Sequence, residues 1–191
     1  MVRGVIPDFF KQVPWFCISN QIFIVAIRSE TVVRVDRVQK VTRGGTIVRY
    51  RCLVVGGNTK GVAGFGIGKA NGPQEAAVLA SRFCKRNIYF VDRYMGSGLT
   101  HDLVGKHNSC KVYLRAVPLG FGLRGNELIE EILVSFGITD AACKARGNRN
   151  VYNVVRATFK ALLTHETIEE IAMKRGKRLL NLERARRLML T

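Results

Sequence analysis

Residues 61–87 have the sequence GVAGFGIGKANGPQEAAVLASRFCKRN, and this stretch decides the fold. Residues 61–68 alternate small with apolar side chains, as a strand does when another backbone lies close against it. A helix is expected to follow, with Asn71 as its cap, Pro73 in its first turn and Gln74 completing a capping box. The stretch therefore predicts a glycine-rich strand that leads directly into a helix.

The helix predicted after the glycine run has one apolar face. Ala76, Ala80 and Phe83 recur at helical spacing, so we expect them to pack against the sheet. The other faces carry basic side chains, namely Arg82, Lys85 and Arg86. We therefore expect the helix to pack back on its own sheet and to present basic charge outward.

The glycine run does not match a nucleotide-binding motif. A P-loop needs four residues between its glycines and then Lys and Ser or Thr, but Ala63 stands five positions before Gly68, and Ala70 follows Lys69. A dinucleotide fingerprint fails as well, because the glycines at 64, 66 and 68 are one residue short of its spacing. Close packing of a strand on a helix explains these glycines better. We therefore predict that the chain is not an enzyme, with a nucleotide-using enzyme as one alternative.

The charge balance indicates a polyanionic partner. The chain of 191 residues carries 31 basic and 14 acidic side chains, a net charge of +17. Nucleic acid is the first candidate for a globular chain this basic, and a membrane surface is the second. Apolar residues make up 47% of the chain, which is enough for one domain or two small ones with a real core.

The five cysteines, at positions 17, 52, 84, 110 and 143, form no CxxC pair. Their odd number and wide spacing argue against a disulfide framework and against a zinc site. We expect small buried thiols, no metal and no other cofactor. The apolar run 16–27 is interrupted by polar residues and is too short to span a bilayer, so we predict no membrane partner.

Residues 30–97 are expected to form the first folded domain. Strands are predicted at about 31–38, 47–55 and 61–68, where apolar and polar side chains alternate between glycine turns. Residues 88–91 are a candidate fourth, short strand. Three antiparallel strands before one helix make an α+β unit that resembles a double-stranded-RNA-binding fold.

Residues 98–178 are expected to form a second α+β domain, separated from the first by the Met95-Gly-Ser-Gly98 break. Its predicted elements are, in order, a hairpin of 99–104 and 111–117, a glycine-rich loop at 118–125, a helix capped by Asn126 and stopped by Gly137, a strand at 141–145, a helix after Asn150, and a short helix with a Thr167–Glu170 capping box closed by Gly176. Residues 1–29 are an extension that is either a targeting leader or a binding segment. Residues 179–191 are predicted to be a basic helical tail that lies between a protein surface and RNA.

Several motifs resemble the small-subunit ribosomal protein S-five family over about residues 30–178. They are Val35-x-Arg37-Val38, the Arg43-Gly44-Gly45 turn, GFGIGKA at 64–70, NVYNVVRAT at 150–158 and MKRGK at 173–177. The segments YFVDRY at 89–94, His101-Asp102 and GFGLR at 120–124 look more like the mitochondrial branch of that family than the bacterial one.

The resemblance implies a fold, a location and partners. The fold is α+β with a double-stranded-RNA-binding-like domain and a C-terminal domain containing a left-handed βαβ crossover. The partners are small-subunit rRNA and ribosomal proteins S-four and S-eight, beside the messenger path, and not a second copy of the chain. The hairpin that reaches rRNA near the decoding region falls on residues 40–45. The implied compartment is the mitochondrial matrix, with the bacterial cytoplasm or a plastid as alternatives.

The chain departs from the family pattern at two positions. Val151 stands where the family usually has proline, so the backbone φ at the start of this helix is not fixed in advance by a proline ring. Glu130 stands where bacterial members carry an arginine at the S-four contact, which puts that contact in doubt. The first 30 residues match nothing in the family.

The predicted sites are contacts, with no catalytic group. His101 and Asp102 are adjacent and should point to opposite faces of a strand, while His107 and His165 are expected to be surface or packing residues. The predicted RNA contacts are Lys40, Thr42, Arg43, Gly44, Gly45, Thr46, Arg49, Arg51, Lys69, Arg82, Lys85, Arg86, Lys144, Arg146, Asn148, Arg149, Lys174, Arg175, Lys177 and Arg178. The predicted contacts with partner proteins are Gly122, Arg124, Asn126 and Glu130.

These contacts predict a scaffolding function. The cations would neutralise rRNA phosphates and release counterions, and the glycine turns would let backbone approach the RNA. We expect the Gly44–Gly45 turn to need a positive φ. A free-standing RNA-binding regulatory protein is the main alternative.

Overall fold

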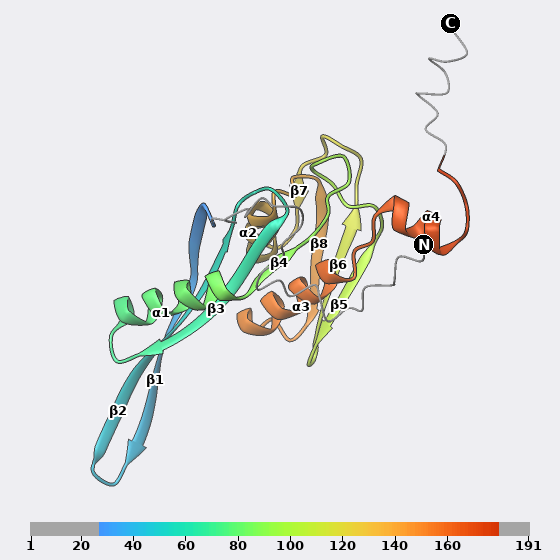
Figure 1. The fold of residues 1–191 in the computed structure, drawn as a ribbon. Helices are drawn as coiled ribbons and strands as arrows, with labels where there is room; N and C mark the ends of the chain where they lie inside the picture. Colours follow the sequence, from blue (N-terminus) through green and yellow to red (C-terminus); the bar gives the residue numbers. More distant parts are fainter. Residues whose placement is uncertain (1–26, 180–191) are drawn as a thin grey trace, which may run out of the picture.

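The structure is a computed structural model that describes residues 27–179, and its first element is a long antiparallel hairpin. Strands β1 (Ser29–Thr42) and β2 (Gly45–Gly57) form this hairpin, and its tip extends beyond the rest of the body (Figure 1). Strands β3 (Val62–Ala70) and β4 (Ile88–Phe90) complete a sheet in the order β1-β2-β3-β4. The candidate strand at 88–91 is therefore confirmed, and the first sheet has four strands.

Helix α1 (Pro73–Arg86) packs on this sheet through the predicted glycines. A Cβ built on Gly64, Gly66 or Gly68 would lie 2.4, 2.0 or 2.2 Å from a backbone oxygen at Asn87, Ala80 or Ala76. No real side chain fits such a gap, so the helix axis can approach the strand this closely only over glycine. The interpretation of the glycine run as a packing surface is confirmed.

Two details of the α1 prediction are wrong. The cap is Gly72, in extended conformation and without a side-chain hydrogen bond, rather than Asn71. The buried face consists of Ala76, Ala80 and Cys84, while Phe83 is 41% exposed. The glycines of β3 demand the smallest side chains at the contact, and positions four apart supply them, which turns the larger Phe83 away from the sheet.

The second sheet lies in the C-terminal half. It consists of β5 (Leu103–His107), β6 (Cys110–Ala116), β7 (Leu123–Arg124) and β8 (Ala141–Gly147), in the order β5-β6-β8-β7. Strands β7 and β8 are parallel, and helix α2 (Glu127–Phe136) connects them as a βαβ unit. Helices α3 (Val151–Leu163) and α4 (Ile168–Lys174) follow. The α+β class is confirmed, and the hand of the crossover stays a prediction.

Two of the predicted boundaries in this half are wrong. The first hairpin strand begins at Leu103, since residues 100–101 form a bend and only residues 103–107 pair with β6. The segment 118–125 is not all loop, since Leu123 and Arg124 form β7. A strand of two residues is too short to show alternation in a sequence.

The helix caps in the C-terminal half agree with the sequence. The side-chain oxygens of Asn126 and Asn150 accept hydrogen bonds from the backbone N–H groups of Leu128 and Tyr152. Gly137 ends α2 with φ of 78°, in the left-handed conformation that glycine adopts without strain. The capping box of α4 is present. With Val151 in place of proline, α3 starts from its asparagine cap.

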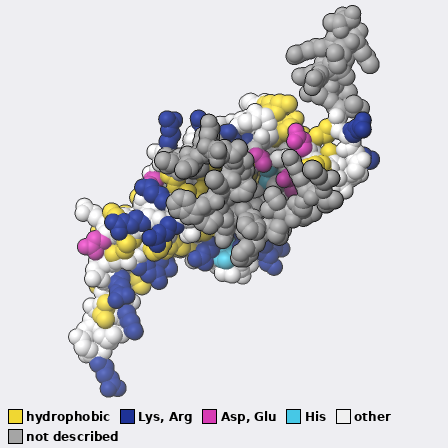
Figure 2. All heavy atoms as spheres, in the orientation of Figure 1, with side chains coloured by type: hydrophobic (Ala, Val, Ile, Leu, Met, Phe, Trp, Pro, Cys, Tyr) yellow, Lys and Arg dark blue, Asp and Glu magenta, His cyan; other side chains and the backbone are white. Residues whose placement is uncertain are grey.

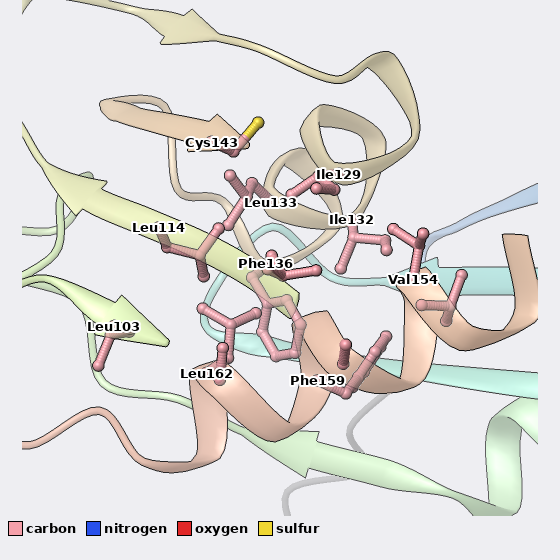
Figure 3. Packing of buried hydrophobic residues seen from close by; sticks show 14 of the residues in the cluster. Leu103, Leu114, Ile129, Ile132, Leu133, Phe136, Cys143, Val154, Phe159 and Leu162 are labelled. Carbon is pink, nitrogen blue, oxygen red and sulfur yellow. The ribbon is translucent and has the colours of Figure 1, made fainter. Parts of the chain in front are cut away.

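One hydrophobic core joins the two sheets. Leu53 and Val55 of β2 face it, while Cys52 and Val54 face α1, as the alternation in β2 predicts. Phe159 of α3 sits at the junction, with its ring centre 4.8 Å from that of Phe65. Side chains from β5, β6, α2 and α3 converge on this core (Figure 3). The core is continuous across the predicted domain boundary at residue 97, and that boundary stays a prediction.

The described cysteines, Cys52, Cys84, Cys110 and Cys143, are buried and free. Burial raises the pKa of the Cys84 thiol to about 11, so this thiol is protonated at neutral pH and unreactive. Cys17 lies outside the described residues. Among residues 27–179, no helix is long and apolar enough to cross a membrane.

Candidate nucleic-acid interface

The tip of the β1–β2 hairpin is exposed on every side. Its two strands pair from Ser29–Gly57 out to Thr42–Gly45, and residues 40–47 have no buried member. Lysine and arginine side chains recur along the hairpin (Figure 2). Most of the predicted contacts of the first sheet lie there, namely Lys40, Thr42, Arg43, Gly44, Gly45, Thr46 and Arg49. A projecting basic arm can enter a groove between RNA helices that the body of the protein cannot reach.

The turn at the tip differs from the prediction in one respect. Arg43 and Gly44 are the turn residues, and the Thr42 hydroxyl donates to the Gly45 carbonyl oxygen at 2.8 Å. Gly45 has φ of 131°, whereas Gly44 has no positive φ. The positive φ is therefore correct for Gly45 and wrong for Gly44. A Cβ on either glycine would meet no heavy atom within 4 Å, so both leave the backbone open to a ligand.

Arg51 is engaged within the protein. Its Nη2 lies 3.2 Å from Asp36 Oδ2, and its guanidinium carbon is 4.0 Å from the centre of the Tyr152 ring. The Tyr152 hydroxyl donates to the same Asp36 oxygen at 2.8 Å, and Arg34 Nε lies 2.6 Å from Asp36 Oδ1. This cluster ties the middle of the hairpin to α3. The geometry favours a positioning role for Arg51, and its contact with RNA stays a prediction.

Asp36 is the anion that holds this cluster together. The hydrogen bond from Arg34, followed by those from Tyr152 and Arg51, lowers the pKa of its carboxyl below the ordinary value. Burial is the foremost cause that raises the pKa of Tyr152, and the adjacent Asp36 carboxylate adds to it. At neutral pH the aspartate is therefore charged and the phenol protonated, which is the state that the hydrogen bonds require.

The cations of α1 lie on its exposed side, as predicted. Arg82, Lys85 and Arg86 are exposed, and so is Lys69 at the end of β3. Lys85 Nζ also lies 2.8 Å from the Glu30 carboxylate, and this ion pair lowers the Glu30 pKa. Because Lys85 is 57% exposed, solvent screens the pair, and the lysine can exchange to a phosphate at small cost.

The C-terminal candidates form two further exposed groups. Lys144 and Arg146 lie on the outer face of β8, and Asn148 and Arg149 follow in the loop before α3. The Asn148 side chain accepts from the Asn150 N–H at 2.9 Å, so it also shapes that loop. The second group is at the end of α4 and consists of Lys174, Arg175, Lys177 and Arg178. Lys174 Nζ lies 2.6 Å from Glu166. The rest of the tail, from residue 180, lies outside the described residues.

The predicted partner-protein residues surround β7. The N–H groups of Gly120 and Gly122 donate to Asp140 Oδ1 at 3.0 Å each, and the Gly122 bond is the first cause that lowers the Asp140 pKa. Arg124 lies over the Phe121 ring, 4.5 Å from its centre. Asn126 caps α2, where Glu130 is half-buried in the first turn. Gly122 and Asn126 thus have roles within the fold, and contacts with another protein stay predictions.

Sequence reasoning missed three cations on the second sheet. Lys106 of β5 and Lys111 and Arg115 of β6 are exposed, whereas their neighbours Val112 and Leu114 are buried. The signal was present, because the alternation in 110–116 places every second residue on the outer face. These cations extend the charged surface formed by Lys144 and Arg146.

Two of the histidines, His101 and His165, lie against each other. His101 stacks on His165 with ring centres 5.6 Å apart, and the Thr100 hydroxyl lies between them, 2.9 Å from His101 Nδ1 and 2.8 Å from His165 Nε2. The prediction that His101 and Asp102 lie on a strand is wrong, since both precede β5. His165 is 7% exposed, which confirms its packing role. Among residues 27–179, no group of three His, Cys, Asp or Glu side chains is placed to hold a metal ion.

Comparison with known proteins gives matches over most of the chain. Residues 29–92 match the family described as ribosomal protein S5, N-terminal domain, and residues 105–175 match ribosomal protein S5, C-terminal domain. A protein of Bradyrhizobium diazoefficiens named small ribosomal subunit protein uS5 is 38% identical over 157 residues, covering 82% of this chain and 80% of the relative. The protein of the same name from Brucella anthropi is 40% identical over 147 residues, covering 77% and 79%. The match includes both sheets and the basic hairpin, and the chain therefore belongs to the ribosomal protein S5 family.

Proposed function

We propose that this chain is a structural protein of the small ribosomal subunit and is held there by contacts with ribosomal RNA. Membership in the S5 family and the names of its relatives support this function. The observation that carries the proposal is the β1–β2 hairpin, whose basic tip projects beyond the core and packs on nothing within the described residues. An exposed, projecting basic arm suits contact with an anionic partner.

The arm and the basic surfaces act by neutralising phosphate. Each lysine or arginine that pairs with a phosphate releases counterions, and this release supplies affinity that falls steeply with salt. Side chains cannot enter the deep major groove of A-form RNA, so recognition of helices rests on shape and backbone contacts. The Asp36 cluster, midway along the hairpin, holds the arm to α3 through the Tyr152 hydrogen bond.

The location of the chain on the subunit and its neighbouring proteins are also part of this proposal. The arm reaches rRNA near the decoding region, beside the messenger path. Ribosomal proteins S-four and S-eight are the proposed neighbours, with residues 122–130 as one contact surface. Cross-linking from a photoreactive group placed at Arg124, followed by identification of the linked protein, tests this surface. Links to neither neighbour would contradict it.

The proposed compartment is the mitochondrial matrix. The resemblance of residues 89–94 and 120–124 to the mitochondrial branch supports it, whereas the relatives described above are bacterial. Fractionation of the source cells separates the two: recovery of the protein with mitochondria supports the matrix, and recovery with a bacterial cytoplasmic fraction, or with plastids, overturns it.

Sedimentation tests the function itself. Tagged full-length protein in an extract of its source cells should sediment with small subunits and shift to the top of the gradient after nuclease treatment. Sedimentation with messenger RNA particles that lack small-subunit RNA would instead identify a free-standing regulatory protein. Sedimentation as a free protein before nuclease treatment would contradict both.

A further inference from the structure

The outer face of the second sheet carries an aromatic side chain among cations. Along β6, Val112 and Leu114 point into the core, so Lys111, Tyr113 and Arg115 point outward. Along β8, Ala141 and Cys143 are buried, so Ala142, Lys144 and Arg146 point outward. The strand register pairs Tyr113 with Lys144 and Arg115 with Ala142. The half-buried tyrosine thus stands in the middle of a basic sheet surface.

This face is hollowed beside the tyrosine. An open cavity of about 440 Å³ is lined by Tyr113, Arg115, Ala142, Cys143, Lys144 and Arg146. Ala142 makes the hollow, because its methyl group lies between two long side chains, Arg115 of β6 and Arg124 of β7, in the sheet register. The Arg146 guanidinium carbon is 5.5 Å from the centre of the Tyr113 ring. Both a phenol ring and a guanidinium offer a flat surface on which a nucleobase stacks.

The charge of this face is of one sign. Within the described residues, none of the strands β5, β6, β7 and β8 contains Asp or Glu. Their exposed cations are Lys106, Lys111, Arg115, Arg124, Lys144 and Arg146. Within residues 27–179, α3 packs on the opposite face of this sheet through β5 and β6, and no described helix is seen to pack on the outer face. An anionic partner therefore fits the surface by charge.

We propose that this face binds an unpaired RNA segment, with one base stacked on Tyr113 above Ala142 and the flanking phosphates on Lys144, Arg146 and Arg115. The inference rests on the proposed rRNA-binding function and names a site for it. An unpaired segment is favoured over a duplex because a duplex keeps its bases stacked inside and presents only phosphates and sugars. The aromatic side chain in a hollow would then contribute nothing, whereas stacking on an aromatic surrounded by cations is the usual way that proteins hold single strands.

The test uses the full-length protein and two probes, a single-stranded RNA 12-mer with one 2-aminopurine and the same strand annealed to its complement. The wild type should bind the single strand more tightly than the duplex and should quench the 2-aminopurine. Tyr113→Leu should weaken single-strand binding about 5- to 150-fold, the range for one lost stacking contact. Tyr113→Phe should retain both affinity and quenching. Tyr94→Leu, at a half-buried tyrosine outside this face, is the matched control and should change neither.

Salt dependence separates stacking from charge. Tyr113→Leu should leave the slope of log K against log salt unchanged. Lys144→Ala should reduce the slope by about 0.7, the value for one phosphate contact with a single strand. Lys60→Ala, at an exposed lysine between β2 and β3, should leave the slope as it is. Ala142→Leu fills the hollow without altering any charge, so it should weaken binding and keep the wild-type slope.

Several outcomes would overturn the proposal. The first is equal affinity of the wild type for the single strand and the duplex. The second is unchanged single-strand binding by both Tyr113→Leu and Ala142→Leu, when their thermal melts match that of the wild type. Displacement of RNA by a glutamate-rich peptide whose own binding is lost in Tyr113→Leu would assign the face to an acidic protein segment. If the wild type sediments with small subunits while these variants bind RNA normally, only this site fails. If the wild type does not sediment with them, the proposed function fails.

Discussion

Replacing Gly66 with alanine should destabilise the protein strongly, although the change adds a single methyl group. The new Cβ would lie 2.0 Å from the Ala80 carbonyl oxygen and 2.4 Å from the Cys84 backbone nitrogen. Real Cβ contacts are essentially never shorter than 3.0 Å, so α1 must move outward by at least 1.0 Å at this point. Both obstacles are backbone atoms inside a helix, so no side-chain rotation can relieve the clash.

The expected cost lies at the upper end of the range for overpacked cores, about 3 kcal/mol. For a chain of this size, each kcal/mol lowers the melting temperature by about 2–4 °C, so Gly66→Ala should melt about 6–12 °C below the wild type. Circular dichroism on heating measures this shift, and urea unfolding gives the free energy directly.

Gly44→Ala is the matched control. Its Cβ would meet nothing within 4 Å and its φ is not positive, so the melting temperature should change by less than about 2 °C. If Gly66→Ala also melted within 2 °C of the wild type, with an unchanged urea m-value, the argument that glycine is required for this strand–helix approach would be refuted.

Three further predictions concern the hairpin. Gly45→Val should cost about 1–3 kcal/mol in urea unfolding because φ at this position is 131°, whereas Gly44→Val should be nearly neutral; equal costs would contradict the turn geometry. Arg43→Ala should weaken binding to small-subunit RNA and reduce the salt slope by about 0.7–0.9, and an unchanged slope would remove Arg43 from the contacts. The pKa of Asp36 is lower in the folded protein than its ordinary value, so its carboxylate contributes stability above pH ~4 that is lost as the pH falls through the folded pKa. Asp36→Asn should therefore be less stable than the wild type at pH 7, and this difference in unfolding free energy should shrink toward pH 2. A difference that stays constant with pH would contradict the role of the cluster.

Much of the local structure is predictable from the sequence because its causes are local. Asn126 and Asn150 cap helices through bonds to residues two positions away, and the capping box of α4 spans three. Glycine at every second position of β3 predicts close packing of the strand on a helix, because a side chain at these positions would keep the helix away. The alternation in β2 correctly separates Leu53 from Cys52, since a strand turns every second side chain to the other face.

The errors arise where distant parts of the chain decide the outcome. Asn71 has the chemistry of a cap, but the cap is Gly72 and the helix starts at Pro73. Arg51 looks like an RNA contact until Asp36 and Tyr152 are seen beside it, and the Tyr152 bond joins residues 116 positions apart. Nothing in a local pattern encodes such a partner.

The sequence predicts that the candidate site binds nucleic acid, but it predicts only some of the residues that form the site. Net charge and the basic turn around Arg43 indicate RNA from the sequence alone. The basic surface around Tyr113 is harder to recognise in the sequence, because its cations come from several strands and only the sheet order β5-β6-β8-β7 brings Lys111 next to Arg146.

The shared core has a consequence for synthesis of the protein. Phe65 of β3 shares a face of the first sheet with Val55, and it is synthesised about 95 positions before Phe159 of α3, whose ring centre lies 4.8 Å from its own. At about 5–20 residues per second, the nascent first sheet shows one apolar face to the cell for about 5–20 s. Its α1 face, by contrast, is covered as soon as residue 86 has left the exit tunnel. The growing chain is thus most exposed to aggregation, and most dependent on chaperones, while its second half is being made.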